Sequence, residues 1–323
     1  TFIYINCEIM VRTLLLTFTL FVFLSSCSKK QPVDKEQITK DDAFRATIKT
    51  GGFVKLSGGF TYYEFENKEA DTVLVMVHGY SVPSYIWDST YYAALNRGYA
   101  ALRYDTYGRG YSDNPDVVYD VALFSNQLKE LLDALGVRKK INLLGLSNGG
   151  RTISAFAFQY PDRIKNLIYV DPSGFETITN ESNYPVMVSD EEITSFKQSD
   201  AYATMASGQL GDFYDPEPFV GWDKKYEEMM RYKGFVRALI STRKNSSSLE
   251  NEQRKIAQSS LPVFAIWGEH DTVVKLDEVR VNLFNRIPTV ELFELPNAGH
   301  LPHMEQAAMF NSILFDQIIC CEH

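Results

Sequence analysis

The chain contains little cysteine, and none of it lies in the body of the sequence. Only four cysteines occur among its 323 residues, at Cys7, Cys27, Cys320 and Cys321. This placement excludes the internal disulfide framework on which many small exported proteins depend. Histidine is also scarce: there are five, and none forms a cluster at the spacing of metal ligands. We therefore predict no metal site.

Positive charge is in short supply as well. The chain has 32 Lys and Arg against 41 Asp and Glu, which gives a formal net charge of −9. Proteins that bind nucleic acid need a basic surface to neutralise phosphates, so we expect no nucleic-acid partner. The apolar content of 45% and the charged content of 23% are ordinary for a globular protein.

The apolar run near the start of the chain is short. It extends from Leu14 to Leu24, whereas a membrane-spanning helix needs about 20 residues. Met10-Val11-Arg12 precedes it and Leu24-Ser25-Ser26-Cys27 closes it, an order that resembles the export signal and lipobox of bacterial lipoproteins. The resemblance implies a signal segment at 1–27, a lipidated Cys27 and a lipid-anchored protein of the bacterial cell envelope. An uncleaved anchor that includes residues 1–9 is the competing interpretation.

The rest of the chain predicts an α/β domain behind a tether. Residues 28–45 are polar and charged, as linkers are, and 53–65 has the pattern of a β-hairpin around Ser57-Gly58-Gly59. Apolar, β-branched segments then alternate with helical patterns, which is typical of a mostly parallel sheet with helices on both faces. The strand patterns after the hairpin are 72–77, 99–104, 141–144, 166–170, 262–268 and 290–295.

This alternation stops between about residues 175 and 258. An insertion of that length is too long for a loop, so we predict a helical cap at 175–258 on a core formed by 46–174 and 259–323. The cap segment is rich in aromatic residues. These either line an apolar pocket for an acyl chain or form the core of the cap itself.

The segment Gly145-Leu146-Ser147-Asn148-Gly149 lies between a strand pattern and a helical pattern. Glycines two residues before and after a serine permit the sharp turn of a nucleophile elbow. The helix that begins there would direct its positive end toward a developing oxyanion. A purely structural turn is the alternative, but the flanking strand and helix favour Ser147 as a nucleophile.

A serine nucleophile needs a base, and the base needs an acid that orients it. Asp271 follows the strand pattern at 262–268, and His300 follows the one at 290–295. Both therefore belong at the carboxyl edge of the sheet, where open α/β sheets bind their ligands. Asp171 is an alternative acid and His303 an alternative base.

Taken in order, these motifs resemble the α/β-hydrolase superfamily, and in particular its capped serine-hydrolase branch of esterases and lipases. The resemblance extends from about residue 53 to 318. It rests on His78-Gly79-Tyr80, the segment from Asp105 to Ser112, the Ser147 elbow, Trp267-Gly268-Glu269-His270-Asp271 and Gly299-His300.

The resemblance implies a role for each of these residues. Ser147 would be the nucleophile, Asp271 the acid and His300 the base. The backbone N–H groups of Tyr80 and Asn148 would hold the oxyanion. His78 and the segment from Asp105 to Ser112 would serve the architecture of the loops.

The implied activity is hydrolysis of a small lipophilic or monoacylglycerol-like carboxylic ester, without a cofactor. Ser147 stands where epoxide hydrolases and haloalkane dehalogenases have aspartate, which argues against an alkyl-enzyme route. Asn148 stands where proline iminopeptidases have tryptophan, which argues against that peptidase activity. A C–C bond hydrolase or acyltransferase with the same triad, or a non-catalytic binding protein of the envelope, are the alternatives. The sequence leaves the oligomeric state open.

Overall fold

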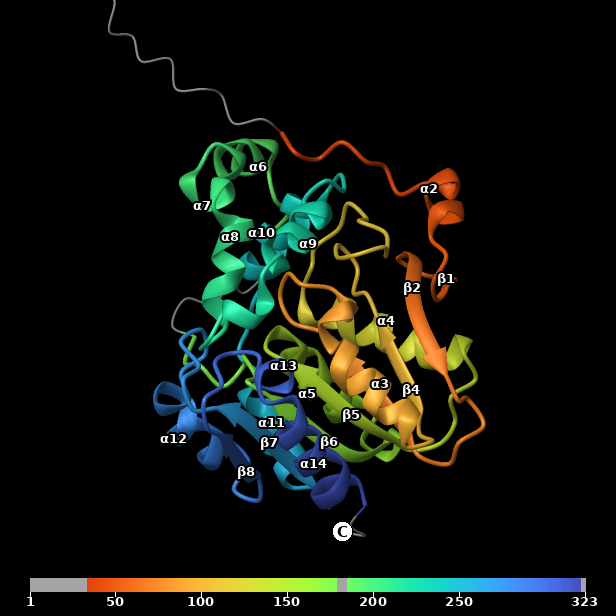
Figure 1. The fold of residues 1–323 in the computed structure, drawn as a ribbon, viewed down its shortest axis with the longest axis vertical. Coiled ribbons are helices and arrows are strands. Elements are labelled where there is room, and N and C mark those ends of the chain that lie inside the picture. Colours follow the sequence, from red (N-terminus) through yellow and green to blue (C-terminus); the bar gives the residue numbers. More distant parts are fainter. Residues whose placement is uncertain (1–33, 179–184, 321–323) are drawn as a thin grey trace, which may run out of the picture. The chain divides into compact units, whose positions relative to one another are not determined.

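The computed structural model describes residues 34–178 and 185–320 (Figure 1). The predicted signal segment and the predicted lipidation site, Cys27, lie outside these residues. Within the described ranges, no helix has the length and apolar character required to cross a bilayer.

The described residues form a mostly parallel sheet whose strand order is β1-β2-β4-β3-β5-β6-β7-β8. The hairpin of β1 and β2 is antiparallel, and β2 pairs antiparallel with β4. Every later pairing is parallel, as the alternating pattern of the sequence predicts. The strands are β1 (Gly52–Leu56), β2 (Gly59–Glu66), β3 (Val73–Val77), β4 (Ala100–Tyr104), β5 (Ile141–Leu146), β6 (Ile164–Val170), β7 (Val263–Gly268) and β8 (Glu291–Leu295).

Helices cover both faces of the sheet, and the central strands are therefore buried on both sides. Along β3, Val75 belongs to one core cluster and Met76 to the other, because successive side chains of a strand point to opposite faces. One face carries α4 (Val121–Ala134), α5 (Asn148–Gln159), α11 (Glu250–Ala257) and α12 (Leu276–Arg286). The other carries α3 (Asp88–Asn96), α13 (Pro302–Glu305), α14 (Ala307–Ser312) and the π-helical turn η5 (Ile313–Ile319).

The insertion between β6 and β7 forms helices and turns, with no strand in its described part. Its helices are α6 (Asp190–Lys197), α7 (Asp200–Ala203), α8 (Met205–Gly208), α9 (Trp222–Met229) and α10 (Phe235–Lys244). Many aromatic residues of this cap, such as Tyr202, Tyr226 and Phe235, are buried in its interior. They thus serve the core of the cap. Helix α11 lies within the predicted cap range, but it packs on the sheet domain against α5 and α12.

The chain is already folded at the first described residues, inside the segment predicted as a tether. Ile38 forms a parallel bridge with Tyr232 of the cap. The carboxylate of Glu36 accepts hydrogen bonds from Val236 N at 2.6 Å and Gly234 N at 3.3 Å, and it pairs with Lys197 at 2.9 Å. Figure 1 shows this segment, in red, leading to the short helix α2 (Asp42–Thr47). We call residues 34–41 the clasp.

Replacing Glu36 with alanine should weaken the hold of the clasp on the cap. The side chain is 8% exposed. Its loss leaves two N–H groups without their acceptor and leaves Lys197 paired with Asp34 alone. We expect a loss of about 1–3 kcal/mol in the free energy of unfolding. At about 2–4 °C per kcal/mol for a chain of this size, thermal unfolding followed by circular dichroism would resolve the change.

The control is Glu69→Ala, which removes an equal charge from an exposed turn. Equal unfolding midpoints for the two variants would show that the clasp contributes nothing to stability.

Candidate active site

Ser147 lies in a sharp turn between β5 and α5. Its backbone angles are φ 51° and ψ −119°, a region that costs a residue with a side chain about 1–3 kcal/mol. The neighbouring glycines explain how the turn closes. A Cβ on Gly145 would lie 2.7 Å from the backbone of Gly149, and one on Gly149 would lie 2.5 Å from the carbonyl oxygen of Val77. Only glycine fits at these two positions.

The turn leaves Ser147 half-buried at the start of α5. The loop after β3 lies beside it, because a Cβ on Gly79 would be 3.8 Å from Ser147 Oγ. This loop continues into Tyr80, one predicted oxyanion donor, and Asn148, the other, begins α5. In the described part of the chain, neither backbone N–H donates a hydrogen bond. Both groups are therefore free to bind an acceptor, at the positive end of a helix.

His300 and Asp271 form a buried pair at the same edge of the sheet. His300 Nδ1 lies 2.9 Å from Asp271 Oδ2. The other oxygen, Asp271 Oδ1, accepts hydrogen bonds from Val273 N at 2.8 Å and Val274 N at 3.0 Å. These bonds hold the carboxylate toward the ring and leave His300 Nε2 on the side away from Asp271.

The electrostatics of this pair favour a charged acid and a basic ring. Burial tends to lower the pKa of His300, but the hydrogen bond and the charge of Asp271 raise this pKa above the ordinary 6.5. Burial tends to raise the pKa of Asp271, but His300 and the two backbone N–H groups lower it. Asp271 is therefore ionised at neutral pH.

Asp171, the alternative acid, lies next to this pair but is bound differently. It is fully buried, has a positive φ of 41° and accepts a hydrogen bond from Gly268 N at 2.9 Å. Burial, and then the negative charge of Asp271, raise the pKa of Asp171 well above its ordinary value. The carboxyl group that hydrogen-bonds the ring of His300 is thus that of Asp271.

Asp171, Asp271 and His300 are also the only potential set of metal ligands in the described ranges, with ligand atoms within 4.8 Å of one another. His300 Nδ1 and Asp271 Oδ2 already bond each other directly at 2.9 Å. This arrangement holds a proton between base and acid.

The remaining histidines of interest are structural. His303, the alternative base, is fully buried. Its Nε2 lies 3.0 Å from the carbonyl oxygen of Ile86, and its ring packs against Trp87 at a tilt of 43°. Burial lowers the pKa of His303 to about 3, which leaves it neutral. His78 accepts a hydrogen bond from Thr106 N at 2.9 Å, so it joins two loops, as the resemblance implies.

Arg109 is a residue whose place the sequence does not reveal. It is 1% exposed, and no carboxylate in the described part of the chain pairs with it. Its Nε donates to the carbonyl of Tyr80 at 2.7 Å, and its Nη2 donates to Thr242 Oγ1 at 2.9 Å. The hydroxyl of Tyr80 donates to the carbonyl of Leu239 at 2.7 Å. A buried cation thus fastens the loop of Tyr80 to cap helix α10.

Known proteins support this description. Residues 72–307 match the family model of the α/β hydrolase fold. Lipase 1 of Psychrobacter immobilis is 25% identical over 291 residues, which is 84% of each chain. A 2-hydroxy-6-oxononadienedioate/2-hydroxy-6-oxononatrienedioate hydrolase of Paraburkholderia phymatum is 26% identical over 255 residues, 75% of this chain and 85% of that one.

A solved esterase of Exiguobacterium antarcticum superposes with a TM-score of 0.67 at 20% identity, over 83% of this chain and 98% of that one. This likeness concerns the fold, and it confirms the fold class predicted from the sequence. Since the family model covers well over half of the sequence, the chain belongs to the α/β-hydrolase family.

Proposed function

We propose that this protein is a serine hydrolase that cleaves carboxylic esters through an acyl-enzyme on Ser147. One observation carries the proposal. A strained, half-buried serine at a helix start shares one edge of the sheet with a buried, hydrogen-bonded His300–Asp271 pair. Such a pair turns a serine hydroxyl into a nucleophile when the ring comes within hydrogen-bond reach of it.

In the proposed mechanism, Ser147 Oγ attacks the ester carbonyl while His300 Nε2 takes its proton. Asp271 stabilises the imidazolium that forms. The backbone N–H groups of Tyr80 and Asn148 bind the oxyanion, and each such donor is typically worth about 2.7–4 kcal/mol in barrier height. His300 then protonates the leaving alcohol.

Deacylation repeats these steps with water. His300 removes a proton from the water molecule that attacks the acyl-enzyme, and it returns that proton to Ser147 Oγ as the acid leaves. No group beyond the chain's own side chains and water is needed to balance the reaction.

We propose a small lipophilic ester as the substrate. The relative named as a lipase supports this choice. A C–C bond hydrolase is the second candidate, because a relative at 26% identity is named for the hydrolysis of a 2-hydroxy-6-oxo dienedioate. The same triad would then attack a ketone carbonyl.

Labelling with a fluorophosphonate should add a single adduct to the parent protein and none to Ser147→Ala, as read by intact mass. His300→Ala should also stay unlabelled, because its serine lacks a base.

Hydrolysis of p-nitrophenyl esters with acyl chains of two to twelve carbons then tests for esterase activity. A 2-hydroxy-6-oxo-2,4-dienoate tests C–C cleavage, and an added alcohol tests acyl transfer. A folded parent that takes no label would favour a binding protein.

Replacing each candidate acid in turn with asparagine should show which of the two supports the base. We expect Asp271→Asn to lower kcat/KM by about 10⁴, the scale seen when a triad acid is removed, and Asp171→Asn to change it by less than about tenfold. Because the base must be neutral, kcat/KM of the parent should fall as the pH drops through a value above 6.5. In Asp271→Asn this fall in kcat/KM should occur at lower pH, because the charge that raises the pKa of His300 is lost. The reverse order of the two losses would assign the acid to Asp171.

We also propose that Cys27 carries a lipid anchor, on the support of the Leu24-Ser25-Ser26-Cys27 sequence. The full-length protein, produced in a bacterium, should partition into the detergent phase of Triton X-114, and Cys27→Ser should move to the aqueous phase. Cys320→Ser is the matched control. Equal partitioning of the parent and Cys27→Ser would contradict acylation at this cysteine.

A further inference from the structure

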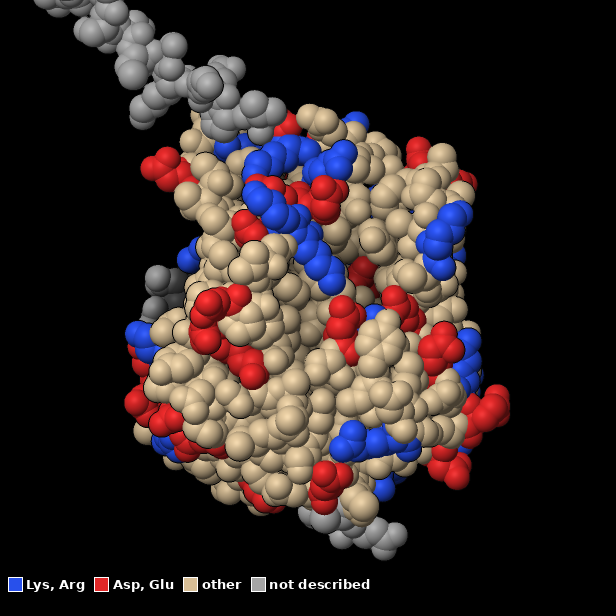
Figure 2. Space-filling model, in the orientation of Figure 1, with Lys and Arg blue, Asp and Glu red and all other residues tan. Residues whose placement is uncertain are grey.

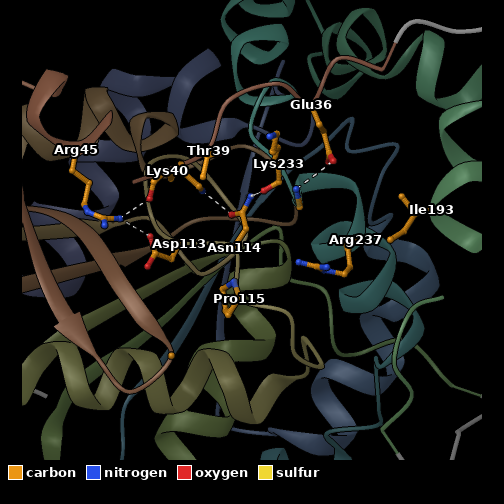
Figure 3. A pocket seen from close by; sticks show the side chains of 12 residues that line it. Glu36, Thr39, Lys40, Arg45, Asp113, Asn114, Pro115, Ile193, Lys233 and Arg237 are labelled. Carbon is orange, nitrogen blue, oxygen red and sulfur yellow. Dashed lines mark hydrogen bonds and ion pairs between the residues drawn. The ribbon is translucent and has the colours of Figure 1, made fainter. Parts of the chain in front are cut away.

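A cavity of about 510 Å³ lies outside the catalytic site, and neither Ser147, Asp271 nor His300 lines it. Most of its lining comes from three parts of the fold that are distant in sequence, and Gly58 and Ile193 complete it (Figure 3). The clasp and α2 form one wall, the loop of Asp113 and Asn114 forms the second, and the start of α10 forms the third. Small-molecule sites usually have volumes of about 300–1,000 Å³.

The two acids of this cavity are already neutralised by the protein. Asp113 Oδ1 pairs with Arg45 at 3.0 Å, and Asp113 Oδ2 accepts a hydrogen bond from Phe60 N at 2.8 Å. Glu36 is bound by α10 and by Lys197, as described above. Both carboxylates are thus paired or hydrogen-bonded within the fold, and the charge of Asp113 also acts on Lys40.

Two basic side chains, Lys233 and Arg237, remain without full compensation. A third, Lys40, is partly buried, and burial lowers its pKa to about 7. The ammonium of Lys40 donates to neutral oxygens, namely the carbonyls of Gly110 and Ser112 and the side chain of Asn114. Lys233 is exposed, and no ion pair holds its side chain within the described ranges.

Arg237 is partly engaged. Its Nη1 pairs with the exposed Asp116 at 3.0 Å, while its Nε is buried and has no hydrogen-bond partner in the part of the chain that the structure describes. Figure 3 shows its guanidinium extending from α10 toward the loop of Pro115. In Figure 2, Lys and Arg side chains gather over α9 and α10 around a small acidic group.

We propose that this cavity binds a small organic anion through a phosphate or carboxylate group, with Lys233 and Arg237 as its ligands. Arg237 supplies a planar donor set that matches either group, and Lys233 supplies a mobile point charge. Lys40 also lines the cavity, but with a pKa of about 7 it carries only part of a positive charge near neutral pH. A bound anion would contact the clasp, the loop of Asp113 and Asn114, and the cap. Its binding would therefore strengthen the association of these three parts. The inference is independent of the proposed ester hydrolysis.

Isothermal titration calorimetry of the protein with sn-glycerol 1-phosphate and with inorganic phosphate tests this site at low ionic strength. We expect saturable binding of glycerol phosphate that weakens at least about tenfold, or 1.4 kcal/mol, in Lys233→Gln/Arg237→Gln. Added salt should also weaken it. Lys255→Gln, an exposed lysine of α11, should bind as the parent does.

Two results would overturn the proposal: no binding of either probe up to about 10 mM, where even weak sites fill, or equal affinity in the parent and the double variant. The double variant changes no residue of the triad, and thermal unfolding followed by circular dichroism reports that it is folded. Because turnover is not measured, failure of this site is distinguishable from failure of the proposed hydrolase.

A second arm identifies the source of the anion. Cys27→Ser protein is sedimented with vesicles of phosphatidylglycerol or of phosphatidylcholine. Binding to phosphatidylglycerol alone, abolished by Lys233→Gln/Arg237→Gln and competed by glycerol phosphate, supports a lipid headgroup. Binding of glycerol phosphate that depends on both cations, without dependence of vesicle binding on them, supports a free metabolite.

Discussion

The close approach of three backbones at the Ser147 turn is the constraint on which the rest of the structure depends. Gly149 lies against the end of β3, and Gly145 lies against Gly149, so β3, β5 and α5 are locked together. Ser147 N also donates to the carbonyl of Val170 at the end of β6. The strained angles of the serine are maintained because the surrounding backbone leaves no room to relax. Any side chain at either glycine would force these elements apart and release the strain.

The sheet order then determines which groups meet. Because β7 and β8 are adjacent and parallel, the loops that follow them emerge at the same edge, and Asp271 reaches His300. The cap is fastened over this edge by hydrogen bonds with neutral partners. Arg109 and Tyr80 both bond to α10, and His300 N donates to the carbonyl of Asp212 at 2.8 Å. The cap therefore shares backbone and side-chain contacts with the very loops that hold the candidate catalytic groups.

Many features of the fold and of the candidate site can be predicted from the sequence, because they depend on residues that lie close together in the chain. The β-branched strand patterns, the glycines around Ser147 and the loops that end in Asp271 and His300 all depend on residues a few positions apart. The rest depends on contacts between distant segments. Glu36 looks like part of a polar linker until α10 is placed beside it, and α11 looks like part of the cap until its packing on α5 is seen. Asp171 and Asp271 follow neighbouring strands with similar sequence signals. Their hydrogen bonds distinguish them, because Asp271 bonds to His300 whereas Asp171 accepts from Gly268 N.

The clasp also bears on the order in which the molecule is assembled. Glu36 and its partner Val236 are 200 residues apart, so their contact closes one of the longest loops in the chain. Such contacts carry a large entropic cost until the segments between them are ordered. The clasp leaves the ribosome before the rest of the described domain, yet its binding site does not exist until α10 has been made and has settled on the core. During that interval this first part of the domain remains an unpaired, solvated segment. It is then accessible to the proteins that act on the nascent chain.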